Sequence, residues 1–185
     1  MRRAPPSGAA SNSVLATQVA FMASAYGDAF LSGDLDASKA HISAVLDHWR
    51  RSFVCVLIGF VALAALINLE ANRSVPRRAT RLALAWTSGV SIVAVAAIRE
   101  SHYFPAHAFF SCAAFGAAVL LAWLLAEDAA SVRRAALLSA VCAATGGLQF
   151  AYLAGLVDKA QFPSWALGAG EFALVVLFGH TISVA

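Results

Sequence analysis

Residues 53–69 read FVCVLIGFVALAALINL, an apolar run without a single charged side chain. A bilayer core about 30 Å thick is crossed by roughly 20 residues of α-helix, with roughly 17 as the lower end. Four further runs meet this length, at residues 82–98, 106–126, 135–157 and 164–184. Backbone polar groups inside a bilayer must bond within their own segment, which a helix achieves. The five runs therefore predict an all-α, multi-pass transmembrane helical bundle.

The composition agrees with a membrane environment. Hydrophobic residues make up 61% of the 185 residues and charged residues 12%, against roughly 45–50% and about 25% in soluble domains. The pI is near 9.0, but the Arg and Lys residues form no basic stripe, so no nucleic-acid partner is expected. Cys55, Cys112 and Cys142 lie inside apolar runs without metal-ligand spacing, which is typical of small buried hydrophobes.

The N-terminal part of the chain is less apolar than the rest. Residues 1–13 are expected to form a polar tail, and residues 14–185 a single membrane domain. Residues 14–31 form either a sixth, weaker span or an amphipathic surface helix. They contain the polar residues Gln18, Tyr26 and Asp28. Residues 32–52 are a polar connection with a partial helical stripe, which indicates an interfacial helix.

Basic residues in short loops predict the orientation of the spans. With six spans, one side of the membrane carries Arg2, Arg3, Arg73, Arg77, Arg78, Arg81, Arg133 and Arg134. The other side, called the outer side, carries Lys39, Arg50, Arg51, Arg99 and Lys159. Lys and Arg gather on the cytoplasmic side, so both termini are expected there.

The compartment is left with two alternatives. An endomembrane location is expected, in the lysosome, Golgi, endoplasmic reticulum or plasma membrane. Residues 1–27 contain no Asp or Glu but do contain Arg and Ser, a composition that is also found in organellar transit peptides. The alternative is therefore the mitochondrial inner membrane or another organellar membrane.

Five polar residues should lie at similar depth in the outer half of the bundle, and they form the candidate site. They are Glu100, His107, Gln149, Tyr152 and Glu171. An ionisable side chain at the centre of a membrane helix costs about 2.5–3.5 kcal/mol, so its presence needs an explanation. Two interpretations stay open: a polar pocket for a lipid headgroup, a proton or a metal ion, or a hydrogen-bonded network that fixes helix packing.

No sequence pattern supports catalysis. The HExxH, GxSxG and P-loop motifs are absent. His107 and His180 belong near opposite membrane surfaces, which disfavours a haem held by two histidines. A zinc hydrolase has candidate ligands only in Glu100, His102 and His107. We therefore expect no enzyme, no catalytic residue, no metal site and no cofactor, although a bound lipid fits the composition.

Three local patterns between Phe53 and Ala185 resemble one family. Residues 89–100 form a glycine-containing helix that ends in an acidic residue, and Glu100 is followed seven residues later by His107, at the mouth of an alanine-rich helix. Glu171-Phe172 is an acidic-aromatic pair in the last run. These patterns are similar to those of the damage-regulated autophagy modulator (DRAM) and Frag-like family of six-helix membrane proteins.

The resemblance implies that residues 14–31 are the first of six helices and that residues 32–52 face the lumen. Arg99 stands where the family has a polar uncharged residue, and Phe172 where it has a tryptophan. The first hypothesis is thus a non-enzymatic membrane protein of the autophagy-modulator type, whose partners are membrane lipids or other proteins. The second is a structural accessory subunit of a large organellar complex, respiratory or photosynthetic, in which its partners are other membrane subunits.

Overall fold

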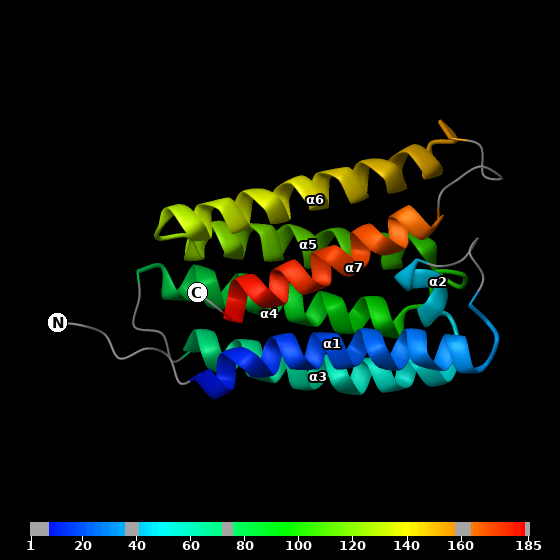
Figure 1. Cartoon of the computed structure of the whole chain (residues 1–185), viewed down its shortest axis with the longest axis horizontal. Helices are drawn as coiled ribbons and strands as arrows, with labels where there is room; N and C mark the ends of the chain where they lie inside the picture. Colours follow the sequence, from blue (N-terminus) through cyan, green and yellow to red (C-terminus); the bar gives the residue numbers. More distant parts are fainter. Residues whose placement is uncertain (1–7, 36–40, 72–75, 158–163, 184–185) are drawn as a thin grey trace.

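The computed structural model describes residues 8–35, 41–71, 76–157 and 164–183, which contain helices and no strand. The helices are α1 (Gly8–Leu31), α2 (Ile42–Leu46), α3 (Trp49–Ala71), α4 (Arg78–Ala97), α5 (Phe104–Leu125), α6 (Ala129–Leu153) and α7 (Ser164–Ser183). Six long helices run side by side, and the short α2 lies at one end of them (Figure 1). We call this end, which corresponds to the predicted outer side, the α2 end.

The six long helices are all long and apolar enough to cross a membrane. The candidate spans are Val14–Leu31, Trp49–Asn68, Arg78–Ala97, Phe104–Leu125, Ala129–Tyr152 and Trp165–Ile182. Helix α1 packs along α3 and α7 and buries Val14, Met22 and Ala25. It is thus part of the bundle, which supports a sixth span over a surface helix. The predicted fold class is confirmed: the chain is a multi-pass, all-helical integral membrane protein.

Helix α6 differs most from its predicted run, since it covers Ala129–Leu153 rather than 135–157. Its start is fixed by a capping box, in which Asp128 Oδ1 accepts the Ser131 N–H at 2.7 Å and Ser131 Oγ accepts the Asp128 N–H at 2.9 Å. Gly155 follows its end with a φ of 68°. Such caps satisfy terminal backbone groups whatever the hydropathy of the flanking residues. The prediction from the apolar run therefore placed both ends of this helix too late in the sequence.

The other boundaries shift less. Helix α1 begins at Gly8, inside the predicted tail 1–13, of which residues 1–7 lie outside the described part. Helix α3 begins at Trp49, so it takes over the end of the predicted connection 32–52. Helices α4, α5 and α7 match their predicted runs to within about one turn.

The predicted orientation stays a prediction. Several of its charges lie outside the described residues, namely Arg2, Arg3, Lys39, Arg73 and Lys159.

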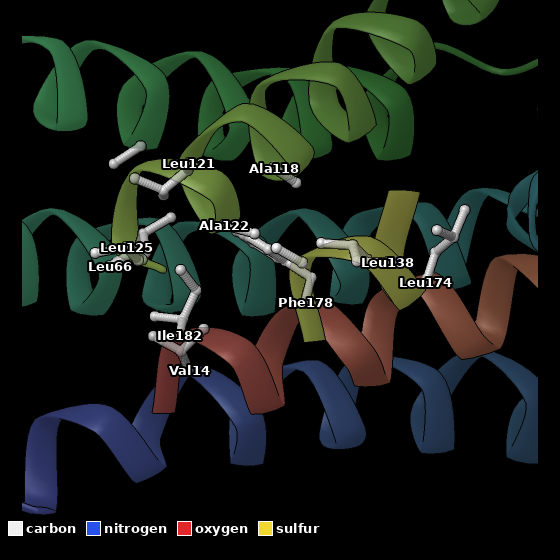
Figure 2. Close-up of a cluster of buried hydrophobic side chains, with 12 residues drawn as sticks. Val14, Leu66, Ala118, Leu121, Ala122, Leu125, Leu138, Leu174, Phe178 and Ile182 are labelled. Atoms are coloured by element: carbon white, nitrogen blue, oxygen red, sulfur yellow. The ribbon is translucent and has the colours of Figure 1, made fainter. Parts of the chain in front are cut away.

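Side chains from all six long helices build the main core (Figure 2). Its larger members are Val14, Leu66, Leu121, Leu125, Leu138, Leu174, Phe178 and Ile182. Three glycines sit so close to a neighbouring helix that a Cβ would meet a side chain there. The pairs are Gly89 with Leu63, Gly170 with Thr145, and Gly179 with Gln18. Lipid tails are as apolar as leucine, so such close packing is a main source of helix association in membranes.

Candidate functional site

Helix α2 folds the connection between α1 and α3 back against the bundle. It contacts α1, α3, α4 and α7. Its Ile42, Val45 and Leu46 are buried in a second core cluster. The other members of that cluster are Phe21, Met22, Ala25, Ala29, Cys55 and Ala96. A helix of five residues has almost no stability of its own, so these contacts and the hydrogen bonds below must hold it in place.

Arg51, near the start of α3, joins α2 to the end of α1. Its Nε donates to Asp28 Oδ2 at 2.8 Å, and its Nη2 donates to Asp34 Oδ2 at 2.6 Å and to Ser32 Oγ at 2.8 Å. Its Nη1 donates to the Val45 carbonyl at 3.2 Å. The planar guanidinium presents several donors in a fixed geometry, which suits such a set of acceptors. Arg51 therefore secures both ends of the connection.

Two carboxylates from different parts of the chain reach the start of α2. The Ile42 N–H donates to Glu171 Oε2, on α7, at 2.6 Å. His41 Nε2 lies 3.4 Å from Glu100 Oε2, just after α4. Ile42 is the first residue of α2, so its N–H has no acceptor within the helix. Glu171 thus accepts a hydrogen bond that the short helix cannot make for itself.

His107 ties α5 to the same segment. It is buried, its Nδ1 lies 2.7 Å from the Ile98 carbonyl, and its Nε2 lies 3.0 Å from Ser43 Oγ. A carbonyl only accepts, so Nδ1 is assigned the proton and donates to Ile98. Both ring nitrogens are therefore engaged by neutral partners.

His41 is the basic group nearest the carboxylates, and it contacts Glu100. Burial by itself lowers the pKa of His41, but the hydrogen bond to Glu100 and the charges of Glu171 and Glu100 together raise that pKa above its ordinary value. Protonated His41 can balance one carboxylate and not two. When both carboxyl groups are ionised, the cluster of His41, Glu100 and Glu171 keeps a negative charge in either state of the histidine.

The structure brings three of the five predicted site residues to α2: Glu100, His107 and Glu171. Gln149 and Tyr152 lie on the last turns of α6, at the same end of the bundle. Helix α6 is separated from α1 and α3 by α5 and α7 (Figure 1), and the hydrogen bonds to α2 described above come from other helices. Gln149 Oε1 is buried without a hydrogen-bond partner among the described residues.

Sequence reasoning missed His41, Ser43 and Arg51. Arg51 was interpreted as a loop charge, and residues 41–43 as part of an interfacial segment. The available signal was the polar pair His41 and Ser43 around the apolar Ile42. That pattern indicates a half-buried segment, but it does not say which helices the segment contacts.

A groove runs between α1 and α7 beside this cluster, with a volume of about 530 Å³. It is lined by Val19, Met22, Ala23 and Tyr26 from α1 and by Trp165, Gly168, Ala169 and Phe172 from α7. Each set recurs at the spacing that places residues on one helix face. The groove exists because Ala23, Gly168 and Ala169 have small side chains or none, while larger side chains form its walls. Its volume lies within the roughly 300–1,000 Å³ that ligand pockets span.

The groove opens on the membrane-facing surface. Val19, Phe172 and Trp165 are 50%, 48% and 67% exposed, and both helices are candidate spans. Met22 and Tyr26 also pack in or against the core cluster that holds α2. The groove and the polar cluster are therefore adjacent parts of one region at the α2 end.

Among the described residues, no group of three or more His, Cys, Asp or Glu side chains is arranged to hold a metal ion. Glu100, His102 and His107 in particular form no such group. Several polar groups at the α2 end bond to each other or to backbone groups, and the groove beside them is apolar. This arrangement suits the binding of an amphipathic molecule.

No family model, curated protein or solved structure matches the chain. The fold and the site define its class as a multi-pass α-helical membrane protein. The resemblance to autophagy modulators stays a prediction.

Proposed function

We propose that this protein is a non-enzymatic membrane protein of the autophagy-modulator type that acts by binding a membrane lipid. An acyl chain occupies the groove between α1 and α7, and the polar end of the lipid lies at the α2 end. The observation that carries the proposal is the groove of about 530 Å³, apolar and open to the bilayer. Hydrocarbon chains are the apolar molecules that surround a membrane-spanning helix, so they are the natural occupants.

The juxtaposition of groove and polar cluster supports the binding of a whole lipid rather than a chain alone. Tyr26 lines the groove and also packs against the core cluster that holds α2. Trp165 lies at the start of α7, where an indole ring suits the membrane interface. A site with an apolar body and a polar end matches the amphipathic form of a lipid.

The proposal also places the protein in a membrane of the endomembrane system with both termini in the cytoplasm. The α2 end then faces the lumen or the cell exterior. Support comes from the excess of Arg and Lys that the sequence predicts on the opposite side of the membrane.

The test compares two phenylalanine substitutions. The full chain is purified from its own membranes in mild detergent, and bound lipid is quantified by mass spectrometry. Ala169→Phe fills the groove, whereas Ala140→Phe adds the same ring to an exposed site on α6. The wild type and Ala140→Phe should retain lipid that Ala169→Phe loses. Equal lipid content in all three proteins contradicts the proposal.

A structural accessory subunit of a large organellar complex is the second candidate. The α6 span is 11% buried, against 33% or 39% for the other five. Its exposed positions include small residues, namely Ala136, Ala140, Ala143, Ala144, Gly146 and Gly147. Small residues let another helix approach closely, which favours a protein partner on this face. Co-migration with bioenergetic subunits in a native gel supports this candidate, and migration as a small solitary particle contradicts it.

A further inference from the structure

The α2 end holds more acidic than basic groups in contact with each other. Glu100 and Glu171 share one histidine, His41. His107 is engaged by Ile98 and Ser43, so its ring nitrogens do not contact either carboxylate. The site therefore complements a positive charge and disfavours an additional negative one.

Arg50 and Arg51, in the first turn of α3 near this site, are already engaged. Asp28 and Asp34 bind the Arg51 guanidinium, and the Arg50 guanidinium stacks on Trp49 at 5.5 Å. Within the described residues, no Arg or Lys forms an ion pair with Glu100 or Glu171. Beyond His41, the described part of the chain therefore supplies no cationic group in contact with these two carboxylates.

Glu171 retains capacity to accept a further hydrogen bond. Its Oε2 accepts from Ile42, and no hydrogen bond to its Oε1 occurs within the described residues. The next residue, Phe172, lines the groove, as does Tyr26, which packs against the core cluster that holds α2. A cation at the polar end of a groove-bound lipid would therefore lie within reach of this carboxylate.

We propose that the bound lipid carries a primary ammonium group, as phosphatidylethanolamine does, and that this group donates hydrogen bonds to Glu171. This inference rests on the proposed lipid-binding function. A primary ammonium has N–H donors for a carboxylate oxygen, whereas the quaternary ammonium of phosphatidylcholine has none. A headgroup with a net negative charge and no amine is repelled by the carboxylates.

The experiment uses purified full-length protein and three lipids with identical acyl chains. Phosphatidylethanolamine, phosphatidylcholine and phosphatidylglycerol are added in equal amounts, and the bound fraction of each is measured by native mass spectrometry. The expected result is a preference of about tenfold for phosphatidylethanolamine over phosphatidylcholine, the size that one hydrogen bond to a charged group supports. Phosphatidylglycerol should bind least.

Two glutamate-to-glutamine variants test the assignment to Glu171. Glu171→Gln keeps an oxygen for the Ile42 N–H but removes the charge, so it should abolish the headgroup preference while total bound lipid is retained. Glu127→Gln makes the same change at an exposed residue of the opposite end, so it should keep the preference. If Glu171→Gln does not fold, Tyr26→Phe at the groove wall should reduce the preference at unchanged total lipid.

The outcomes separate the inference from the function beneath it. Equal binding of phosphatidylethanolamine and phosphatidylcholine by the wild type overturns the inference and leaves lipid binding intact. A preference that survives in Glu171→Gln also overturns it. If the wild type and Ala169→Phe bind equal amounts of lipid, then no lipid binding depends on the groove, and the proposed function itself is contradicted.

Discussion

Replacement of Arg51 by methionine should detach the connection between α1 and α3 from the bundle. Methionine has a similar length but no donor, so four hydrogen bonds are lost, to Asp28, Ser32, Asp34 and Val45. These acceptors differ in their access to water. The carboxylates of Asp28 and Asp34 are 48% and 51% exposed, whereas the bond to the Val45 carbonyl is buried.

The expected loss of stability follows from that difference. Water can replace Arg51 at the two exposed carboxylates, so those ion pairs contribute little. The buried carbonyl left without a donor costs about 1–3 kcal/mol. We therefore expect Arg51→Met to lower the free energy of unfolding by about 1–3 kcal/mol. Arg50→Met is the matched control, because Arg50 is exposed and stacks on Trp49, and it should change stability by less than about 0.5 kcal/mol.

The assay is reversible unfolding in mixed micelles with increasing sodium dodecyl sulfate, followed by circular dichroism. A second readout is the pH dependence. Hydrogen bonds from Ser32 and Arg51 hold the pKa of Asp34 below its ordinary value, so this carboxylate stabilises the fold at neutral pH and loses that effect as pH falls through the folded pKa. The loss on acidification should be smaller in Arg51→Met. If the two methionine variants are equally stable, Arg51 does not hold the connection.

Two further predictions concern the close glycine contact and the histidine at α2. Gly89→Ala should destabilise the bundle by about 1–3 kcal/mol, because its Cβ meets Leu63. Gly116→Ala, where nothing lies within 4 Å, should be neutral or stabilising by up to about 1 kcal/mol; equal effects in the same unfolding assay would contradict the packing. His41 has a raised pKa, so its contribution is present below the ordinary value of about 6.5 and is lost as pH rises through the folded pKa. The stability difference between wild type and His41→Gln should therefore shrink from pH 6 to pH 9, and a constant difference would contradict the His41–Glu100 interaction.

Hydropathy predicted five of the six spans and their order because bilayer thickness sets a minimum length for every apolar run; for residues 14–31 it left a surface helix as the alternative. It was less informative about helix ends, since those depend on single side chains. Asp128 and Ser131 start α6 through a capping box, well before the apolar run begins. Each such cap satisfies backbone groups in the aqueous or interfacial region, where hydropathy carries no signal.

The depth of a residue in the membrane could be predicted from the sequence, but the helices that surround it could not. Counting residues from the helix ends placed Glu100, His107, Gln149, Tyr152 and Glu171 at one end, and they do lie there. The count says nothing about helix rotation or about which helices are adjacent. His107 and Glu171 share α2 as a partner because both helices border it, whereas α6 packs on α5 and α7. The role of residues 41–43 depends wholly on that tertiary arrangement.

The two interpretations of the polar cluster make opposite predictions for Glu171→Leu. A lone carboxylate in a span costs about 2.5–3.5 kcal/mol, and the Ile42 N–H is the hydrogen bond that offsets it within the described residues. Glu171→Leu leaves the Ile42 N–H without its acceptor, which costs about 1–3 kcal/mol, but it also removes the cost of the carboxylate, which is of similar size. A leucine should therefore pack against the apolar residues around α2 with little net loss, while lipid selectivity disappears. If the cluster serves helix packing alone, Glu171→Leu should instead unfold the α2 segment, which increased labelling of the buried Cys55 by a thiol reagent would reveal in a variant without Cys112 and Cys142.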